Sequence, residues 1–239
     1  GKSDPLVINT DLYNISTLPA DSRTTEHISS SLSSLQKVLS EVIGRTATRI
    51  DTSRESVRSG ENGFANFIAD CLRNFYHADI ALINGGCIRG NREYPAQSVL
   101  TKGDIWQELP FGNRIVQIRV TGKQILAAIE NGLSRREDLK GRFPHVSGLQ
   151  VNWNPSLPPG KRVLQITVGG QLLQMDHTYQ LATTEYLAKG GDGYESLTKG
   201  VRMVKEGGGL PLWEYVQQEI IRQSIIFPRV DGRMQTEGK

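Results

Sequence analysis

Hydrophobic residues recur at helical spacing near the start of the chain. Most are three or four positions apart, which predicts a surface helix with one apolar stripe over residues 25–44. Thr24 or Thr25 can cap its start, and Gly44 can end it. Residues 1–24 show no clear periodicity, and we interpret them as an arm or the remnant of a linker. The apolar stripe consists of Ile28, Leu32, Leu35, Leu39, Val42 and Ile43.

The rest of the chain alternates between helical and strand-like patterns. Thr101 with Asp104 has the form of a helix start, and Thr121 with Gln124 forms a T-x-x-Q capping box. The pair Gly169-Gly170 between two apolar runs indicates a β-hairpin. This mixture predicts a single α+β domain, an α/β-type mixed sheet with flanking helices. Helices are predicted at residues 61–76, 101–108, 121–133 and 212–224, and strands at 78–83, 114–120, 146–153, 162–168, 172–175 and 178–188.

The composition is that of an ordinary globular chain, with 239 residues, 37% of them hydrophobic, and 25 glycines. There are 28 basic and 25 acidic residues and no long basic run, so nothing favours a nucleic-acid-binding protein. The longest uninterrupted apolar run, residues 125–129, is too short to be a transmembrane segment. Two cysteines, Cys71 and Cys87, cannot make a disulfide framework. Any specific chemistry must therefore come from local motifs.

The first such motif is the loop Asn84-Gly-Gly-Cys-Ile-Arg89, which follows an apolar strand directly. Open α/β sheets bind ligands at the ends of their strands. The glycines let the backbone approach a ligand closely, Asn84 offers an amide, and Arg89 offers a planar fork that suits phosphate or carboxylate. The ordinary alternative is a tight turn with a solvated arginine.

Two further loops carry aromatic and acidic residues. Phe111 lies between a proline and a glycine, where it is either a surface on which a ring can stack or a plug of the core. Asp192 is surrounded by three glycines and can accept two hydroxyls, as acidic residues do with ribose, or it can serve the turn itself. Tyr186 would offer a second aromatic face. Arg58, just before a predicted helix, adds positive charge for an anion or is simply exposed.

No catalytic motif accompanies these loops. The four histidines are far apart in the sequence and form no H-x-x-x-H or D-x-H spacing. The chain has no C-x-x-C, no phosphate-binding G-x-x-x-x-G-K-[ST] and no G-x-S-x-G. The sequence therefore predicts a binding site without a catalytic centre and without a cofactor or metal of its own. The histidines are His27, His77, His145 and His177.

Taken in order, the motifs resemble the C-terminal domain of the 5′-nucleotidase family, which includes UDP-sugar hydrolases and 2′,3′-cyclic phosphodiesterases. The resemblance covers roughly residues 45–225, and no single motif would carry it alone. The motifs are R-x-x-E-N-x-x-x-N from Arg58, ALINGGCIR, LPFGN, VTGKQI, HVSGLQV and EYLAKGGDGY.

The resemblance implies a two-domain phosphohydrolase of which this chain holds only one domain. An N-terminal metallophosphoesterase domain would bind two divalent metal ions, such as zinc, and would hydrolyse nucleoside 5′-monophosphates. Residues 45–239 would be the substrate-binding domain, and the helix at 25–44 would link the two. The partners implied are a nucleoside or nucleotide and that N-terminal domain, and the location implied is extracellular, periplasmic or at the cell surface. Alone, the chain is expected to be inactive.

The resemblance also assigns roles to the loop residues. Phe111 and Tyr186 match two aromatics that sandwich the base, although the second is usually phenylalanine. Asp192 matches the carboxylate that holds the ribose hydroxyls, and Asn84 matches an asparagine that contacts the base. Arg58 and Arg89 match arginines that hold the phosphate or nearby oxygens.

Two departures from the family pattern stand out: E-N-G-F-A-N replaces the usual E-[ST]-N-L-G-N, and Cys87 replaces a glycine. The Cys87 thiol beside the site is either open to oxidation or packed. A stand-alone nucleoside-binding module, the substrate domain of a UDP-sugar or cyclic-nucleotide hydrolase, and a relative such as a thiosulfohydrolase remain alternatives. Base preference and oligomeric state stay open.

Overall fold

The computed structural model describes residues 21–203, 205 and 207–237, and the chain divides into two compact units, residues 1–38 and 39–239. Residues 1–20 of the predicted arm (residues 1–24) lie outside the described residues. In the first unit, helix α1 (Ser22–Leu39) begins three residues before the predicted start. The reason is its cap, because Asp21 Oδ1 accepts the Thr24 N–H at 2.8 Å and this hydrogen bonding lowers the pKa of Asp21. Neither threonine takes the predicted role.

The predicted end of this helix is also wrong. Helix α1 ends at Leu39, and Val42–Thr46 forms strand β1, which pairs with β5 and β13. The side chain of Ile43 is buried in the second unit, whereas Val42 is exposed. Gly44 does not end a helix, because it lies within β1. A Cβ at this position would lie 2.8 Å from the Ser224 carbonyl oxygen. The glycine instead lets β1 pass close to the backbone at that point.

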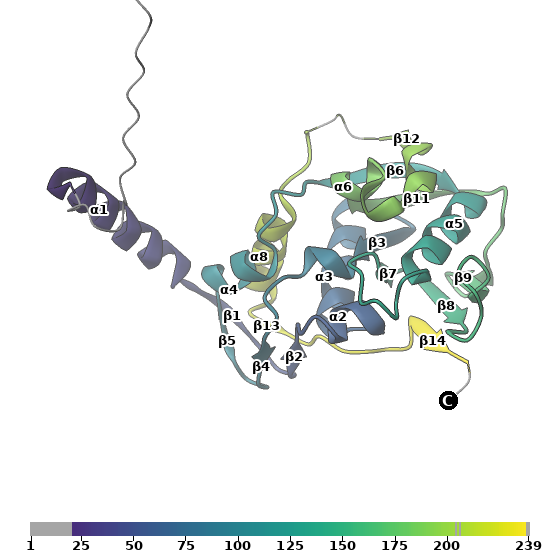
Figure 1. The fold of residues 1–239 in the computed structure, drawn as a ribbon, viewed down its shortest axis with the longest axis horizontal. Coiled ribbons are helices and arrows are strands. Elements are labelled where there is room, and N and C mark those ends of the chain that lie inside the picture. The colour runs from purple at the N-terminus through teal and green to yellow at the C-terminus, as the bar shows by residue number, and fades with distance from the viewer. Residues whose placement is uncertain (1–20, 204, 206, 238–239) are drawn as a thin grey trace, which may run out of the picture. The chain divides into compact units, whose positions relative to one another are not determined.

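The second unit contains four sheets and seven α-helices among its described residues (Figure 1). The five-stranded sheet has the order β12 (Val201–Arg202), β6 (Ile115–Thr121), β11 (Thr178–Thr184), β3 (Ile80–Asn84), β7 (Pro144–Ser147). The four-stranded sheet has the order β10 (Gln171–Leu172), β9 (Val163–Val168), β8 (Leu149–Trp153), β14 (Met234–Thr236). The two smaller sheets are β13 (Ile225–Ile226), β1, β5 (Val99–Thr101) and β2 (Ile50–Asp51), β4 (Glu93–Tyr94). The helices are α2 (Ser56–Ser59), α3 (Gly63–Tyr76), α4 (Lys102–Glu108), α5 (Gly122–Leu133), α6 (Glu185–Ala188), α7 (Glu195–Thr198) and α8 (Leu212–Gln223), with 3₁₀ turns η2 (Gly85–Cys87) and η3 (Gly191–Gly193).

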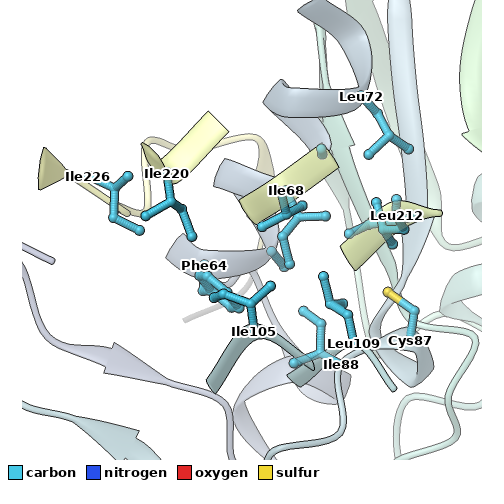
Figure 2. Packing of buried hydrophobic residues seen from close by; sticks show 14 of the residues in the cluster. Phe64, Ile68, Leu72, Cys87, Ile88, Ile105, Leu109, Leu212, Ile220 and Ile226 are labelled. Atoms are coloured by element: carbon cyan, nitrogen blue, oxygen red, sulfur yellow. The ribbon is translucent and has the colours of Figure 1, made fainter. Parts of the chain in front are cut away.

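Strand β3 is buried on both faces and joins two hydrophobic cores. Ala81 and Ile83 belong to a core formed with α3, α4 and α8, part of which is shown in Figure 2. Ile80 and Leu82 belong to a second core, formed with α5 and the four-stranded sheet. Successive side chains of a strand point to opposite faces, so this short apolar run fills both cores at once. The polar loop that begins at Asn84 is thereby fixed at the end of a rigid strand.

Several further predicted elements are confirmed and three are corrected. The helices α3, α4, α5 and α8 form as expected, with both capping boxes, and the Gly169-Gly170 turn joins β9 to β10. The predicted strand at 172–175 is reduced to the two residues of β10, Gln171–Leu172. The predicted strand at 146–153 is broken at Gly148, whose φ is +77°, into β7 and β8, which lie in different sheets. The predicted strand at 178–188 ends at Thr184, whose side chain caps α6. Tyr186 therefore lies on a short helix.

Candidate functional site

All six residues predicted to bind a ligand line one pocket of about 340 Å³. They come from segments far apart in the sequence that meet at the end of β3: α2, the loop around η2, the loop after α4, α6 and η3. Four more residues, which sequence reasoning did not assign to the site, complete the lining. The predicted residues are Arg58, Asn84, Arg89, Phe111, Tyr186 and Asp192, and the additional ones are Gly86, Cys87, Asn113 and Gly141.

A hydrogen-bonded cluster centres on the Asp192 carboxylate. Asn84 Nδ2 donates to Oδ2 at 2.7 Å, and the Tyr186 hydroxyl donates to Oδ1 at 3.0 Å. The Tyr186 hydroxyl oxygen also accepts the Asp192 backbone N–H at 3.1 Å. Burial and the hydrogen bond donated to the Asp192 carboxylate raise the pKa of Tyr186, so its hydroxyl stays protonated at neutral pH. Because Asn84 must present its amide nitrogen to a carboxylate, its buried Oδ1, which has no partner among the described residues, is the free acceptor.

The two arginines of the pocket have no carboxylate partner among the described residues. Arg58 Nη1 donates to the Leu139 carbonyl at 3.2 Å, and Arg58 Nε is buried without a partner in the part of the chain that the structure describes. Burial, followed by the positive charges of Arg54 and Arg89, lowers the pKa of Arg58. An anion entering here would relieve this charge repulsion and could accept hydrogen bonds from the guanidinium.

Both predicted aromatics are accessible. Phe111 is 45% exposed and Tyr186 is 43% exposed, which rejects the alternative that Phe111 is a plug of the core. The Arg89 guanidinium lies over the Phe111 ring, 5.5 Å from its centroid. These aromatic side chains are therefore available to a flat ligand.

The glycine-rich loop is held by backbone contacts that explain its glycines. Gly85 and Gly86 donate N–H groups to the Phe143 and Gly141 carbonyls, both at 2.7 Å. A Cβ on Gly86 would lie 2.9 Å from the Gly141 Cα, so the two glycines allow this close approach. Cys87 packs in the hydrophobic core, and burial raises the pKa of its thiol to about 12, which favours the packed interpretation over an oxidisable one.

Sequence reasoning missed the residues that support the site from behind. Glu108 is fully buried, and its carboxylate accepts hydrogen bonds from the Gly90 N–H at 3.1 Å and the Tyr94 hydroxyl at 2.8 Å. His145 Nε2 lies 2.9 Å from the Val57 carbonyl oxygen, next to Arg58. Each of these contacts joins residues more than ten positions apart in the sequence, and no local sequence pattern predicts them. The only available signal was the position of Glu108 directly before the LPFGN turn.

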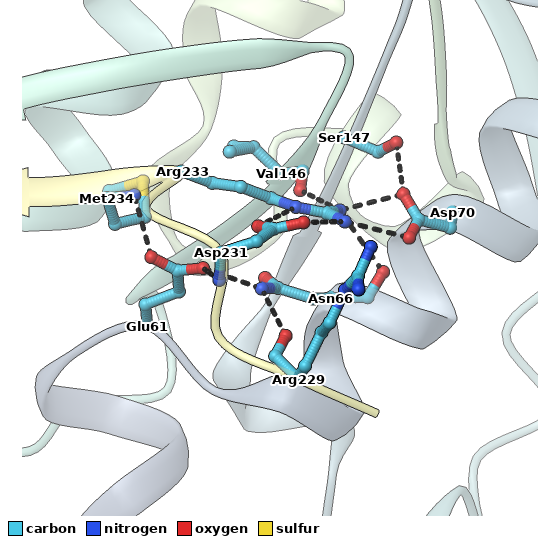
Figure 3. A network of polar contacts seen from close by, with 9 residues as sticks. All are labelled: Glu61, Asn66, Asp70, Val146, Ser147, Arg229, Asp231, Arg233 and Met234. Carbon is cyan, nitrogen blue, oxygen red and sulfur yellow. Dashed lines mark hydrogen bonds and ion pairs between the residues drawn. The ribbon is translucent and has the colours of Figure 1, made fainter. Parts of the chain in front are cut away.

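The second unit has a larger recess, of about 580 Å³, beside α3 and α8. Figure 3 shows its polar network, in which Arg233 pairs with Asp70 at 2.7 and 2.8 Å and with Asp231 at 2.7 and 3.0 Å. Glu61 accepts the backbone N–H groups of Asp231 and Met234, which fastens the start of β14. This network anchors the end of the described chain.

Among the described residues, no group of three histidine, cysteine or acidic side chains is placed to hold a metal ion. No helix in the same part of the chain has both the length and the apolar character needed to cross a membrane.

Comparison with known proteins gives a consistent result. Residues 42–199 match the family described as the 5′-nucleotidase C-terminal domain. The chain is 33% identical to a trifunctional nucleotide phosphoesterase of Bacillus subtilis, covering 95% of this chain and 16% of that protein. It is 28% identical to a 5′-nucleotidase of Diplobatis ommata, covering 98% and 42%.

Among solved structures, a 5′-nucleotidase precursor from Thermus thermophilus matches with a TM-score of 0.81 at 30% identity, covering 92% of this chain and 44% of that one. The chain thus spans less than half the length of these relatives.

Proposed function

Because the chain belongs to the 5′-nucleotidase C-terminal domain family, we propose that it is the nucleotide-binding part of a two-domain, metal-dependent 5′-nucleotidase. The observation that carries the proposal is the single pocket in which six residues from separate segments meet. The names of the related proteins, nucleotide phosphoesterase and 5′-nucleotidase, agree with a nucleotide as the ligand.

Each part of a nucleotide has a chemical counterpart in the pocket. The exposed faces of Phe111 and Tyr186 would hold the base by stacking, worth about 1–3 kcal/mol for each stacked base. Asp192 would accept the ribose hydroxyls, because each of its oxygens keeps a free lone pair after its contact inside the protein. Arg58 and Arg89, which lack carboxylate partners among the described residues, would attract the phosphate.

We assign hydrolysis itself to an N-terminal metallophosphoesterase domain, whose two metal ions would activate the attacking water. This chain contributes binding and orientation of the substrate. The helix α1 would be the link between the two domains, and the complete protein would act on nucleotides outside the cytoplasm. On this proposal the isolated chain binds a nucleoside but releases no phosphate from a nucleoside monophosphate.

The proposal is tested by calorimetric titration of adenosine and AMP into the chain and into Asp192→Ala. The variant should bind adenosine at least about tenfold more weakly, since it loses hydrogen bonds to a charged acceptor. Asp176→Ala removes an exposed carboxylate paired with Lys123 and serves as the matched control, with unchanged affinity. Equal affinity in the wild type and in Asp192→Ala would contradict the assigned role of Asp192, and absence of binding by the wild type would contradict the proposal.

A further inference from the structure

Among the described residues, the Tyr186 hydroxyl forms hydrogen bonds with Asp192 alone. It donates to the carboxylate oxygen Oδ1 at 3.0 Å and accepts the backbone N–H of the same residue at 3.1 Å. One hydroxyl thus bridges the main chain and the side chain of Asp192. This arrangement fixes the direction in which the carboxylate points.

Asp192 needs such support because its backbone is in the left-handed region, with φ at +54° and ψ at +21°. That conformation is unfavourable for most residues other than glycine. Two further contacts help to hold it: Asn84 Nδ2 binds Oδ2 at 2.7 Å, and Asn131 Nδ2 binds the Asp192 carbonyl oxygen at 3.2 Å. Four hydrogen bonds from three side chains therefore fix this one residue.

The ring and the hydroxyl of Tyr186 have separate surroundings. The ring lies against Gly191, where a Cβ would be only 2.5 Å from the ring carbons, and the side chain remains 43% exposed. The ring can therefore stack on a ligand while the hydroxyl stays on Asp192. Each carboxylate oxygen has two lone pairs and uses one of them here, which leaves two acceptor positions for a pair of hydroxyls.

We propose that Tyr186 is a positioning residue whose hydroxyl orients the Asp192 carboxylate toward a ribose diol, so that the pocket selects ribonucleosides over nucleosides without those hydroxyls. The inference rests on the proposed nucleotide-binding function. A preorganised acceptor binds a ligand without first having to be ordered, so the gain falls on ligands that reach the carboxylate. Stacking depends on the ring and is shared by both kinds of ligand.

The test is calorimetric titration of adenosine and 2′,3′-dideoxyadenosine into the wild type and Tyr186→Phe, which keeps the ring. The expected result is an affinity for adenosine about three- to tenfold lower, with a much smaller change for the dideoxynucleoside. The selectivity of the pocket for the ribonucleoside should fall by the same factor. Tyr215→Phe is the matched control outside the pocket and should change neither affinity.

Two results would overturn the inference while leaving the proposed function intact. If Tyr186→Phe weakens both ligands equally, the hydroxyl acts on the ring and not on Asp192. If the variant binds adenosine more tightly, the hydroxyl competes with the ribose. Failure of the wild type to bind either ligand would instead overturn the proposed function, and the inference with it. Thermal melting of Tyr186→Phe alongside the wild type shows whether both are equally folded.

Discussion

The two polar recesses of the second unit are built from similar residues but differ in how their charges are balanced. In the larger recess, Arg233 lies between two carboxylates, and hydrogen bonds to both raise its pKa. In the smaller one, Arg58 and Arg89 have no carboxylate partner within the described residues, and the pKa of Arg58 is lowered. Each recess contains two buried side-chain atoms without a partner among the described residues, so unsatisfied atoms alone do not distinguish them.

On the proposed function the smaller recess is the binding site, and volume and polarity alone would not have identified it. The larger recess uses Arg233 and Glu61 to fasten β14 to α3 and β7. In the smaller recess, Arg58 and Arg89 have no carboxylate partner among the described residues, and the rings of Phe111 and Tyr186 are exposed. A substitution in a structural network should lower the free energy of unfolding, whereas a substitution in a binding pocket should lower the affinity for the ligand.

The largest expected effect is on the structural side. Replacing Arg233 by methionine removes its several charged hydrogen bonds to Asp70, Asp231 and the Val146 carbonyl, and we expect the free energy of unfolding to fall by about 3–5 kcal/mol. Urea denaturation measures this loss, and the folded fraction should bind adenosine as before. Arg222→Met is the control, because its pair with Glu219 involves an exposed arginine and should contribute little to stability. A loss as small as the control's would remove Arg233 from its structural role.

The second-largest expected effect is that of acid, to which the two regions should respond over different pH ranges. His145 supports the pocket from a fully buried position, and burial lowers its pKa from 6.5 to about 4. The unfolded chain therefore takes up a proton that the folded chain does not, and stability present above pH 6.5 should fall by about 3 kcal/mol as the pH drops to 4. The ion pair between Arg233 and Asp231 should persist to a lower pH, because hydrogen bonding to Arg233 lowers the pKa of Asp231 below 3.8.

Urea denaturation at pH 7, 5 and 4 measures this slope. In His145→Gln the overall stability should be lower but the slope between pH 7 and 4 much shallower. An unchanged slope in that variant would mean that another group takes up the proton.

The smallest effect concerns one aromatic ring from each recess. Phe111→Ala should weaken adenosine binding by about 1–3 kcal/mol, since a stacking surface is lost, with little change in melting temperature because the ring is 45% exposed. Phe227→Ala removes an aromatic that lines the larger recess and is 64% exposed, and it should leave adenosine affinity unchanged. Calorimetry and thermal melting on both variants make the comparison. If both variants lost the same adenosine affinity, the proposed difference between the two recesses would be wrong.

Local motifs pointed to residues that the structure gathers, but not to the connections around them. Asn84, Phe111 and Asp192 lie in local motifs and line one pocket, while their binding of a ligand stays a prediction. The end of α1 was mispredicted because Val42 and Ile43 continue the helical spacing, while pairing with strands from distant parts of the chain decides their structure.

The contacts that support the pocket were not predicted for the same reason. The Glu108 carboxylate reaches Gly90 and Thr52, and Asn131 reaches Asp192 across 61 positions of sequence. Hydrogen bonds of this kind depend on the folded geometry and leave no periodic trace in a single sequence. The hydrogen bond between Tyr186 and Asp192 is local. It was not predicted, because Tyr186 was assigned to a strand and in fact lies on the short helix α6.

Strand β3, which serves two cores at once, also bears on how such a domain could change its ligand in evolution. A substitution within residues 80–83 disturbs packing on one side of the sheet or the other, so this segment has little freedom to vary. The groups proposed to meet a ligand lie on loops and single helical turns around the end of β3, where exchanges leave both cores untouched. Such a scaffold can acquire a new specificity one loop at a time without risking the fold.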